Sequence, residues 1–170
     1  MGSNLTVLSK SDFSYMSSYL FNLSYDKLKQ LYSIYKLKCE TFMIDYNEFQ
    51  EIFNESEDIF LLWDNSETCL IDSLEIFSGI CIFSHTDIKN KLKFLFEIFD
   101  FNDLKSLSLY DIEFICLYCL NSIYHILKIK EKPKIEDVRK LVFLYNKDNI
   151  RINLYQLKEF VFGTTDIISF

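Results

Sequence analysis

The stretch Lys91–Tyr118 constrains the fold of this chain more than any other part of the sequence. Apolar residues recur before Asp100 at the spacing of an amphipathic helix, and a second apolar run follows Asp111. The loop that these two residues bound is twelve residues long, with Leu107 at its eighth position. This order predicts a helix, a twelve-residue loop and a second helix. The apolar residues before the loop are Phe94, Phe96, Ile98 and Phe99.

The composition favours an all-α chain that forms one domain or two small lobes. Of 170 residues, 49% are hydrophobic, three are glycine and one is proline, which disfavours folds rich in tight turns. The net charge of −7 argues against nucleic acid as the main partner and suits a basic or amphipathic helix. Aromatic residues reach 17%, which codon bias and selection for a sticky interior explain equally well.

Five cysteines without a signal peptide predict a reducing, cytoplasmic setting. No window of eighteen apolar residues occurs, so we predict no transmembrane helix. The first six residues fit the pattern for myristoylation of Gly2, although Met-Gly-Ser also begins many engineered chains. We therefore expect membrane attachment only if Gly2 is acylated, and one acyl chain anchors weakly.

A second twelve-residue loop runs from Asp64 to Glu75. It carries oxygen-bearing side chains at positions 1, 3, 5, 9 and 12, where calcium-binding loops between helices place their ligands. These residues are Asp64, Ser66, Thr68, Asp72 and Glu75, and Leu70 adds its carbonyl. Cys69 stands at position 6, where the backbone turns left-handed and a non-glycine residue costs roughly 1–2 kcal/mol. We expect weak calcium binding here or none.

The loop from Asp100 to Asp111 keeps fewer ligands. Leu104 at position 5 offers no side-chain oxygen, and Lys105 replaces the glycine of the sharp turn at position 6. Asp111 is shorter than the glutamate that normally closes the calcium cage with two oxygens. The remaining oxygen-bearing side chains form a remnant site that we do not expect to bind calcium. They belong to Asp100, Asn102, Ser108 and Asp111.

Two more loops are vestigial. Ile44–Phe49 resembles the end of such a loop, with Glu48 at position 12, but no acidic residue stands at positions 1 and 3. Residues 146–156 form a loop one residue short, with Gln156 at position 12. Neither loop has the oxygens of a calcium cage.

These motifs resemble the second and third hands of a broad EF-hand group that includes neuronal calcium sensors, calcineurin B-like proteins and calaxin. The resemblance is strong over residues 60–165 and rests on residues 71–83, Lys91–Asn102 and a long connector before the fourth loop. It implies a calmodulin-like protein with two lobes of paired hands, at residues 1–84 and 85–170. Position-8 residues of paired loops would form short antiparallel bridges, and apolar surfaces would hold an amphipathic helix of a partner.

The sequence departs from this family in two respects. No loop has glycine at position 6. Only sixteen positions separate Glu48 from Asp64, whereas twenty-five separate Glu75 from Asp100. Nine missing residues correspond to about two and a half helical turns. The helices between the first two loops must therefore be short, or the first loop is misplaced.

Apolar residues at helical spacing could form the core, a partner groove or both. The candidates for the groove are Ile80, Phe83, Phe94, Phe99, Leu117, Leu120, Tyr124 and Phe160. An apolar groove needs an occupant, which could be a partner helix or the chain's own tail. That tail contains Ile167, Ile168 and Phe170.

No motif indicates an enzyme. Cys116 and Cys119 form a CxxC inside an apolar helix, which favours core packing over metal or redox chemistry. His85 and His125 stand in no ligand motif, and the phosphate-loop, GxSxG and HExxH patterns are absent. We predict a non-catalytic protein.

Two hypotheses follow. In the first, the chain is a scaffold subunit that holds a partner helix largely without calcium, with a ciliary or cytoskeletal assembly suggested by the resemblance to calaxin. In the second, loop Asp64–Glu75 binds Ca²⁺ and switches the first lobe, with an N-terminal myristoyl group as an option. A regulatory subunit of a phosphatase or kinase would differ from these only in its partner.

Overall fold

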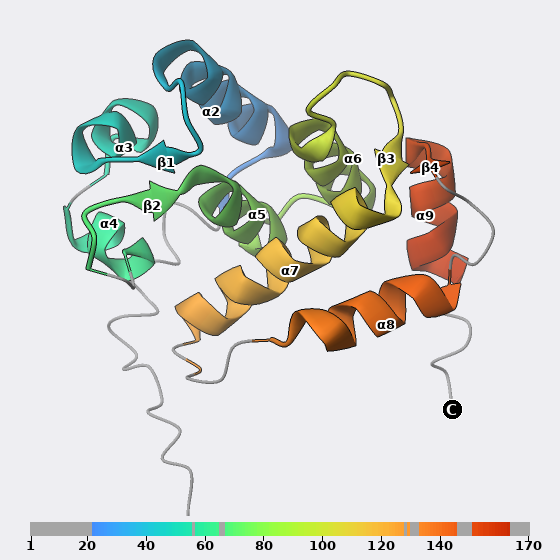
Figure 1. Cartoon of the computed structure of the whole chain (residues 1–170). Helices are drawn as coiled ribbons and strands as arrows, with labels where there is room; N and C mark the ends of the chain where they lie inside the picture. Colours follow the sequence, from blue (N-terminus) through green and yellow to red (C-terminus); the bar gives the residue numbers. More distant parts are fainter. Residues whose placement is uncertain are drawn as a thin grey trace, which may run out of the picture. The chain divides into compact units, whose positions relative to one another are not determined.

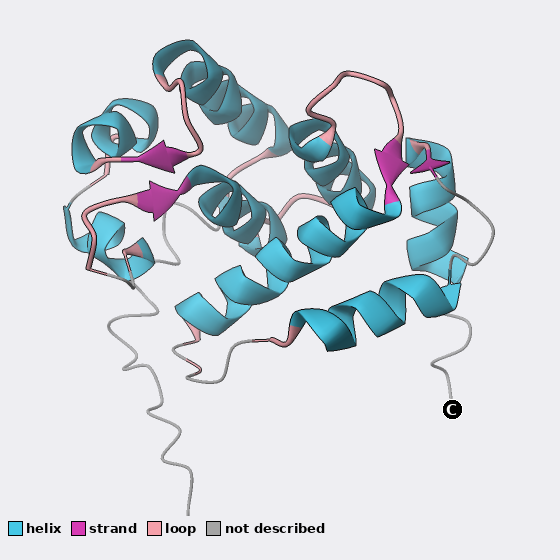
Figure 2. Cartoon of the chain, viewed as in Figure 1, coloured by secondary structure: helices cyan, strands magenta, loops and turns pink. Residues whose placement is uncertain are grey.

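The computed structural model describes residues 22–55, 57–64, 67–127, 129, 133–145 and 151–163. These residues are mostly helical, and four two-residue strands form two antiparallel pairs (Figure 1, Figure 2). The all-α class and the short antiparallel pairs are thus confirmed. Within the described ranges, every helix is too short or too polar to cross a membrane.

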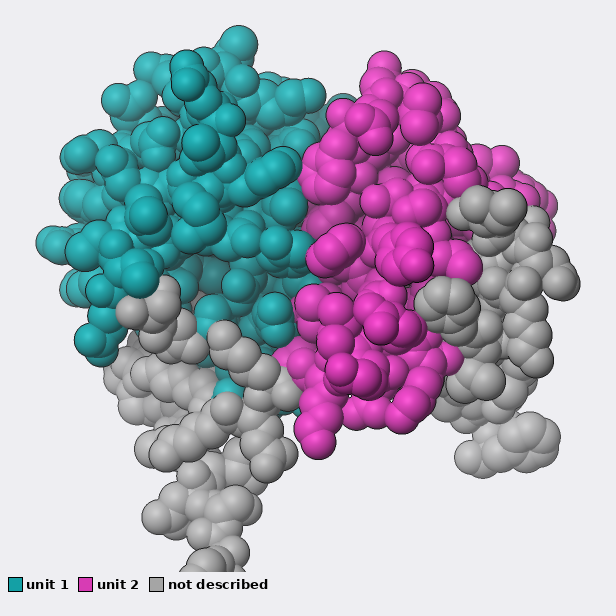
Figure 3. Space-filling view, viewed as in Figure 1, with its two compact units in different colours: residues 1–86, 118–132 teal, residues 87–117, 133–170 magenta. Residues whose placement is uncertain are grey.

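The chain divides into two compact units (Figure 3). Unit 1 comprises Met1–Thr86 and Tyr118–Lys132, and unit 2 comprises Asp87–Leu117 and Pro133–Phe170. Helix α7 (Leu109–Ile126) is continuous, so its first part belongs to unit 2 and its last part to unit 1.

Capping residues set where the helices of unit 1 begin. Ser24 accepts a hydrogen bond from the Lys27 N–H, and Asp72 accepts one from the Leu74 N–H, so each satisfies a free donor of a first turn. The elements before α7 are α2 (Tyr25–Lys38), β1 (Met43–Ile44), α3 (Tyr46–Phe53), α4 (Glu57–Trp63), β2 (Ile71–Asp72) and α5 (Ser73–Phe83). Helices α3 and α4 have 8 and 7 residues, in agreement with the short spacing between Glu48 and Asp64.

Strand β1 pairs with β2, and Ile44 lies opposite Ile71. Both isoleucines are at the eighth position of their loops and both are buried. Helix α2 packs against α3 and α5, and aromatic rings fill the space between them. The Phe53 ring centroid lies 4.9 Å from that of Phe49 and 5.4 Å from that of Phe77. Much of the aromatic content of this part of the chain is therefore core.

Unit 2 repeats this layout. Its elements are α6 (Ile88–Phe99), β3 (Leu107–Ser108), the first part of α7, α8 (Ile135–Tyr145), β4 (Arg151–Ile152) and α9 (Leu154–Gly163). Leu107 lies opposite Ile152 in the β3–β4 pair, and α6 packs against α9. The buried carboxylate of Glu113 on α7 accepts hydrogen bonds from Nε and Nη2 of Arg139 on α8, at 2.9–3.2 Å. This ion pair joins the two helices.

Several predictions fall outside the described residues. They concern Gly2, Ser66, the Phe160 side chain, the first five residues of the fourth loop and the apolar tail of Ile167, Ile168 and Phe170.

Candidate functional site

Loop 2 (Asp64–Glu75) is held by the carboxylate of its first residue. Asp64 is buried at the end of α4, where Oδ1 accepts the Thr68 N–H at 3.0 Å and Oδ2 accepts the Cys69 N–H at 2.8 Å. The Glu67 N–H donates to the Asp64 carbonyl at 3.3 Å, which closes a turn. Glu67 and Cys69, at positions 4 and 6, have left-handed backbones with φ of 54° and 59°. One carboxylate thus fixes the backbone at Thr68 and Cys69.

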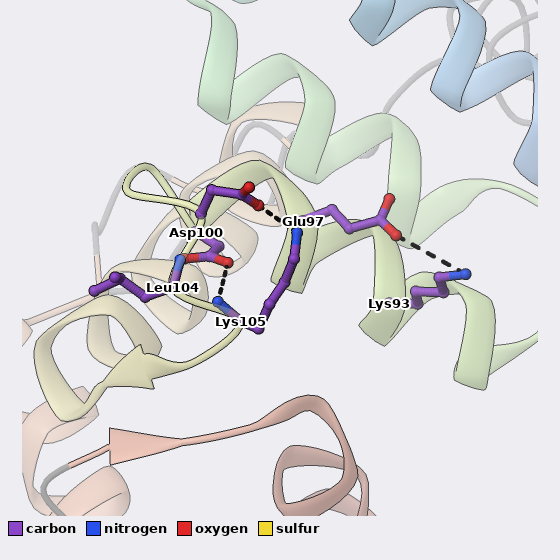
Figure 4. Close-up of polar contacts among 6 residues, drawn as sticks. Lys93, Glu97, Asp100, Leu104 and Lys105 are labelled. Atoms are coloured by element: carbon purple, nitrogen blue, oxygen red, sulfur yellow. Dashed lines mark hydrogen bonds and ion pairs between the residues drawn. The ribbon is translucent and has the colours of Figure 1, made fainter.

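Loop 3 (Asp100–Asp111) has the same backbone arrangement (Figure 4). Asp100 Oδ1 accepts the Leu104 N–H at 3.0 Å, and Oδ2 accepts the Lys105 N–H at 2.8 Å. The Asp103 N–H donates to the Asp100 carbonyl at 3.1 Å. Positions 4 and 6 are again left-handed, with φ of 52° at Asp103 and 54° at Lys105. We call this shared arrangement of positions 1, 4, 5 and 6 the loop frame.

The loop frame forms in both loops although neither has a glycine. A left-handed backbone costs roughly 1–2 kcal/mol per non-glycine residue, so each loop stores this free energy at two positions. Hydrogen bonds from backbone N–H groups to a charged acceptor contribute about 1.5–3 kcal/mol each and can offset that cost. The aspartate at position 1 is therefore sufficient to hold the turn.

Three of the loops end in a reciprocal capping box between positions 9 and 12. They are loop 1 (37–48), loop 3 and loop 4 (146–156). In each box, the side chain at position 12 accepts the N–H of position 9, and the side chain at position 9 accepts the N–H of position 12. The N–H···O distances lie between 2.7 and 3.2 Å. Position numbers in loop 4 follow the twelve-residue pattern despite its missing residue. The pairs are Asp45 with Glu48, Ser108 with Asp111, and Asn153 with Gln156.

Loop 2 ends differently, because its two carboxylates meet side chains of α7. The Tyr118 hydroxyl donates to Asp72 Oδ2 at 2.9 Å, while Asp72 Oδ1 accepts the Leu74 N–H. Burial raises the pKa of the Asp72 carboxyl, and the hydrogen bond from Tyr118 opposes this shift. The Glu75 carboxylate points to His125, and Glu75 Oε1 lies against His125 Nδ1 in a close contact without an aligned hydrogen bond.

A third residue of α7, Ser122, completes this contact. Its hydroxyl lies 2.6 Å from the Glu75 carbonyl and 2.8 Å from the Tyr118 carbonyl. Gly79 on α5 faces the same place. A Cβ added there would overlap the Trp63 ring and would lie 3.0 Å from Ser122 Cβ. Glycine is therefore required for the close approach of α5 to α7.

The residues that we predicted as calcium ligands in loop 2 do not form a calcium cage in the structure. Asp64 is bonded to its own loop, Asp72 and Glu75 are bonded to α7, and the Leu70 carbonyl lies 3.3 Å from the Thr68 hydroxyl. Calcium needs six to eight converging oxygens. Across the described ranges, no three histidine, cysteine or acidic side chains converge in a way that could hold a metal ion. Ser66 lies outside those ranges.

The remnant ligands of loop 3 are also engaged or exposed. Both oxygens of Asp100 accept backbone N–H groups, and Asp111 Oδ2 accepts both the N–H and the hydroxyl of Ser108. Asn102 is exposed, and Leu104 has no side-chain oxygen to offer. The Asp100 and Asp111 carboxylates are thus directed to the loop's own backbone and to Ser108.

The predicted groove residues do not form an open groove in either unit. Ile80, Phe94 and Phe99 are each about 1% exposed and belong to the core. Phe83, Leu120 and Tyr124 of unit 1 are half-buried, as is Leu117 of unit 2. A helix could reach the three core side chains only after the helices around them separate.

The sequence did not predict a hollow of about 550 Å³ in unit 2 beside loop 3. Charged residues of α6 and loop 3 face apolar residues and an asparagine near the start of α9. Lys93 already pairs with Glu97 (Figure 4). Lys105 likewise pairs with Asp103. The lining residues are Phe96, Glu97, Asp100, Asp103, Lys105, Asn153, Leu154 and Tyr155.

Sequence reasoning also missed the role of Tyr118, Ser122 and His125. Their spacing of four and then three residues places them on one face of a helix that is otherwise largely apolar, which was the available signal. Cys116 and Cys119 in the same helix are half-buried, and burial raises the pKa of the Cys116 thiol. This environment disfavours a reactive thiolate at Cys116.

No protein-family model matches the sequence, and no curated protein matches it significantly.

Proposed function

We propose that this chain is a non-catalytic EF-hand protein that keeps the EF-hand framework with little or no calcium chemistry and serves as a binding subunit for an amphipathic helix. Three features support the EF-hand assignment. Two loops share the loop frame, position-8 residues pair between loops 1 and 2 and between loops 3 and 4, and position 12 lies in the first turn of a helix in every loop.

The observation that carries the calcium-independent part of this proposal is the state of the position-9 and position-12 side chains. In loop 2, the Tyr118 hydroxyl of α7 bonds Asp72, and the Glu75 side chain lies against His125 of α7. In the other loops the two side chains cap one another. These side chains are thus directed to protein groups without a cation. A fold stabilised in this way does not require calcium.

An apolar stripe on the first part of α7 supports the binding role. Tyr110 and Phe114 are 64% and 46% exposed, and half-buried Leu117 follows at the next helical position. Residues at this spacing lie on one face of a helix and are the kind of anchors that an amphipathic partner helix uses. The net charge of −7 favours a basic partner. A cytoplasmic setting in a ciliary or cytoskeletal assembly remains part of the proposal through the resemblance to calaxin alone.

A calcium sensor that switches through loop 2 is the second candidate. The observation in its favour is Asp64, which already forms the loop frame next to four further candidate ligand residues that the structure describes. Switching would require Asp72 and Glu75 to leave α7 and turn into the loop.

Calorimetric titration of the full chain with Ca²⁺ and with Mg²⁺ separates the two candidates. We expect no heat of binding below millimolar cation. A sub-micromolar calcium site that disappears in Glu75→Gln would contradict the scaffold proposal and favour the sensor.

The partner requires a separate test. Partner proteins are first captured from the native cell by affinity purification. The amphipathic segment of each captured protein is then synthesised as a peptide and titrated directly. We expect one such peptide to bind equally well in calcium and in EGTA, and to bind at least about tenfold more weakly to Phe114→Glu. Glu97→Gln on α6 is a control at an exposed site away from the stripe.

A further inference from the structure

Three side chains of α7 meet loop 2 and α5 within unit 1. Tyr118 bonds Asp72, Ser122 bonds the Glu75 carbonyl, and His125 lies against the Glu75 carboxylate. The side chains of Glu75 and His125 are only 16% and 11% exposed. We call Tyr118, Ser122 and His125 the α7 latch.

The α7 latch distinguishes loop 2 from the other loops. Elsewhere the side chain at position 12 closes a capping box with position 9 of its own loop. In loop 2, Asp72 still caps α5, but the Glu75 side chain is directed to α7. The loop with the most oxygen-bearing ligand positions is thus the loop whose closing carboxylate is held by another helix.

The contact is closely packed and also leaves polar atoms unsatisfied. Gly79 allows the Trp63 ring and Ser122 to approach α5. Within the described ranges, Nε1 of Trp63, Oε1 of Glu75 and both ring nitrogens of His125 are buried and have no hydrogen-bond partner. Buried polar atoms without partners destabilise the state that contains them, so the closed latch carries a built-in penalty. Such a contact can be displaced by a ligand that competes for the same carboxylates.

We propose that the α7 latch occupies the carboxylates of loop 2 in place of a divalent cation, so that cation binding and latch closure exclude one another. The inference rests on the proposed EF-hand assignment of loop 2. Calcium would need Glu75 to turn from His125 into the loop and to offer both oxygens. It would also need oxygens of Asp72, one of which accepts the Tyr118 hydroxyl. Loop 2 is therefore a calcium site that the chain's own helix inhibits.

Trp63 provides the readout, because it is the single tryptophan of the chain, immediately precedes Asp64 and packs at the latch. Ca²⁺ is titrated into the full chain while Trp63 emission is followed. The double variant Tyr118→Phe with His125→Leu removes two latch contacts at nearly constant volume, because neither new side chain can donate a hydrogen bond. We expect this variant to bind Ca²⁺ at least about tenfold more tightly than the wild type, since each lost contact involves a charged acceptor. Tyr124→Phe removes a hydroxyl from the same part of α7 and is expected to leave the affinity unchanged.

Equal affinity of the wild type and the double variant would overturn the proposal, and so would a double variant that does not bind Ca²⁺ at all. In the latter case, the calcium-independent scaffold function would survive. Tight binding by the wild type would contradict the scaffold function, while the ratio of the two affinities would still decide on the latch.

A measurement on the wild type avoids dependence on the folding of the variant. At millimolar Ca²⁺, amide hydrogen exchange of residues 118–126 should accelerate as loop 2 fills, because the latch must open. Filling of loop 2, seen as slower exchange at Thr68 and Cys69, without faster exchange in α7 would overturn the proposal. At saturating Ca²⁺, unchanged hydrogen exchange both at Thr68 and Cys69 and in residues 118–126 would also overturn the proposal. The latch would then not compete with a cation.

Discussion

Loops 2 and 3 have the same beginning and different ends. In both loops, an aspartate at position 1 accepts the N–H groups of positions 5 and 6, and positions 4 and 6 are left-handed. Loop 3 closes on itself through Ser108 and Asp111, whereas loop 2 is closed by α7. The loop frame is therefore independent of the chemistry at positions 9 and 12. Those positions are free to serve packing between helices.

The comparison also assigns two roles to α7. The helix begins at the capping box of loop 3 and ends on the carboxylates of loop 2. The two ends of one continuous helix therefore take part in the closing contacts of two different loops.

The largest expected effect concerns the first residue of each loop. Asp64→Ala removes two charge-assisted hydrogen bonds at a buried site and should destabilise the chain by about 2–3 kcal/mol. Asp100→Ala should cost only about 1 kcal/mol, because water reaches the half-buried loop 3 site. Urea unfolding of both variants measures the difference. Equal losses would show that the two loop frames do not differ in this respect.

Gly79→Ala tests the packing that is special to loop 2. The added methyl group would overlap Trp63 and crowd Ser122, so we expect a loss of about 2 kcal/mol in urea unfolding. Ser78→Ala on the same helix is the matched control. It removes a buried hydroxyl without a partner among the described residues, and it should leave stability unchanged or slightly raise it. If Gly79→Ala leaves the free energy of unfolding unchanged, α5 and α7 leave room for a methyl group at this position.

Glycine at position 6 should stabilise both loops. Cys69→Gly and Lys105→Gly relieve a left-handed backbone, and we expect a gain of up to about 1 kcal/mol each after the entropy of glycine is deducted. Leu104→Gly, at a position without positive φ, serves as the control and should be neutral or destabilising. The gain in stability is measured by thermal unfolding. A gain in one loop alone would show that the two loop frames differ.

The smallest expected effect is a pH dependence at Asp72. Burial raises the folded pKa of this carboxyl above its ordinary value of 3.8, so its contribution to stability is largest below that pH and is lost as the pH rises through the folded pKa. Asp72→Asn removes this dependence. The stability of Asp72→Asn relative to the wild type should therefore be higher at pH 7 than at pH 3.5, as determined by urea unfolding at both values. The opposite trend would contradict the assignment of burial as the main cause.

Local signals in the sequence were enough to predict much of the fold. Ile44, Ile71 and Leu107 were placed at position 8 by counting from acidic residues, and each lies in a strand pair. The short distance from Glu48 to Asp64 predicted short helices, and α3 and α4 are short. These features depend on spacing and capping within a few residues, which is information that a single sequence contains.

The end of loop 2 could not be predicted in the same way. Tyr118 and His125 reach their partners across 46 and 50 residues, and nothing local links an aromatic hydroxyl or a lone histidine to a distant carboxylate. Ile80, Phe94 and Phe99 show a second difficulty. The same apolar spacing describes a core and a groove, and the structure places these three side chains in the core.

Thermal unfolding in 1 mM EGTA and in 1 mM CaCl₂ tests most directly the central claim that the loops hold their shape without a cation. We expect the chain to unfold in the same cooperative transition in both conditions, with midpoints within about 2 °C of each other. A site with a Kd of about 10 μM would raise the midpoint by roughly 5–10 °C in calcium. A shift of that size, or loss of the cooperative transition in EGTA, would show that the loops need a cation to hold their shape.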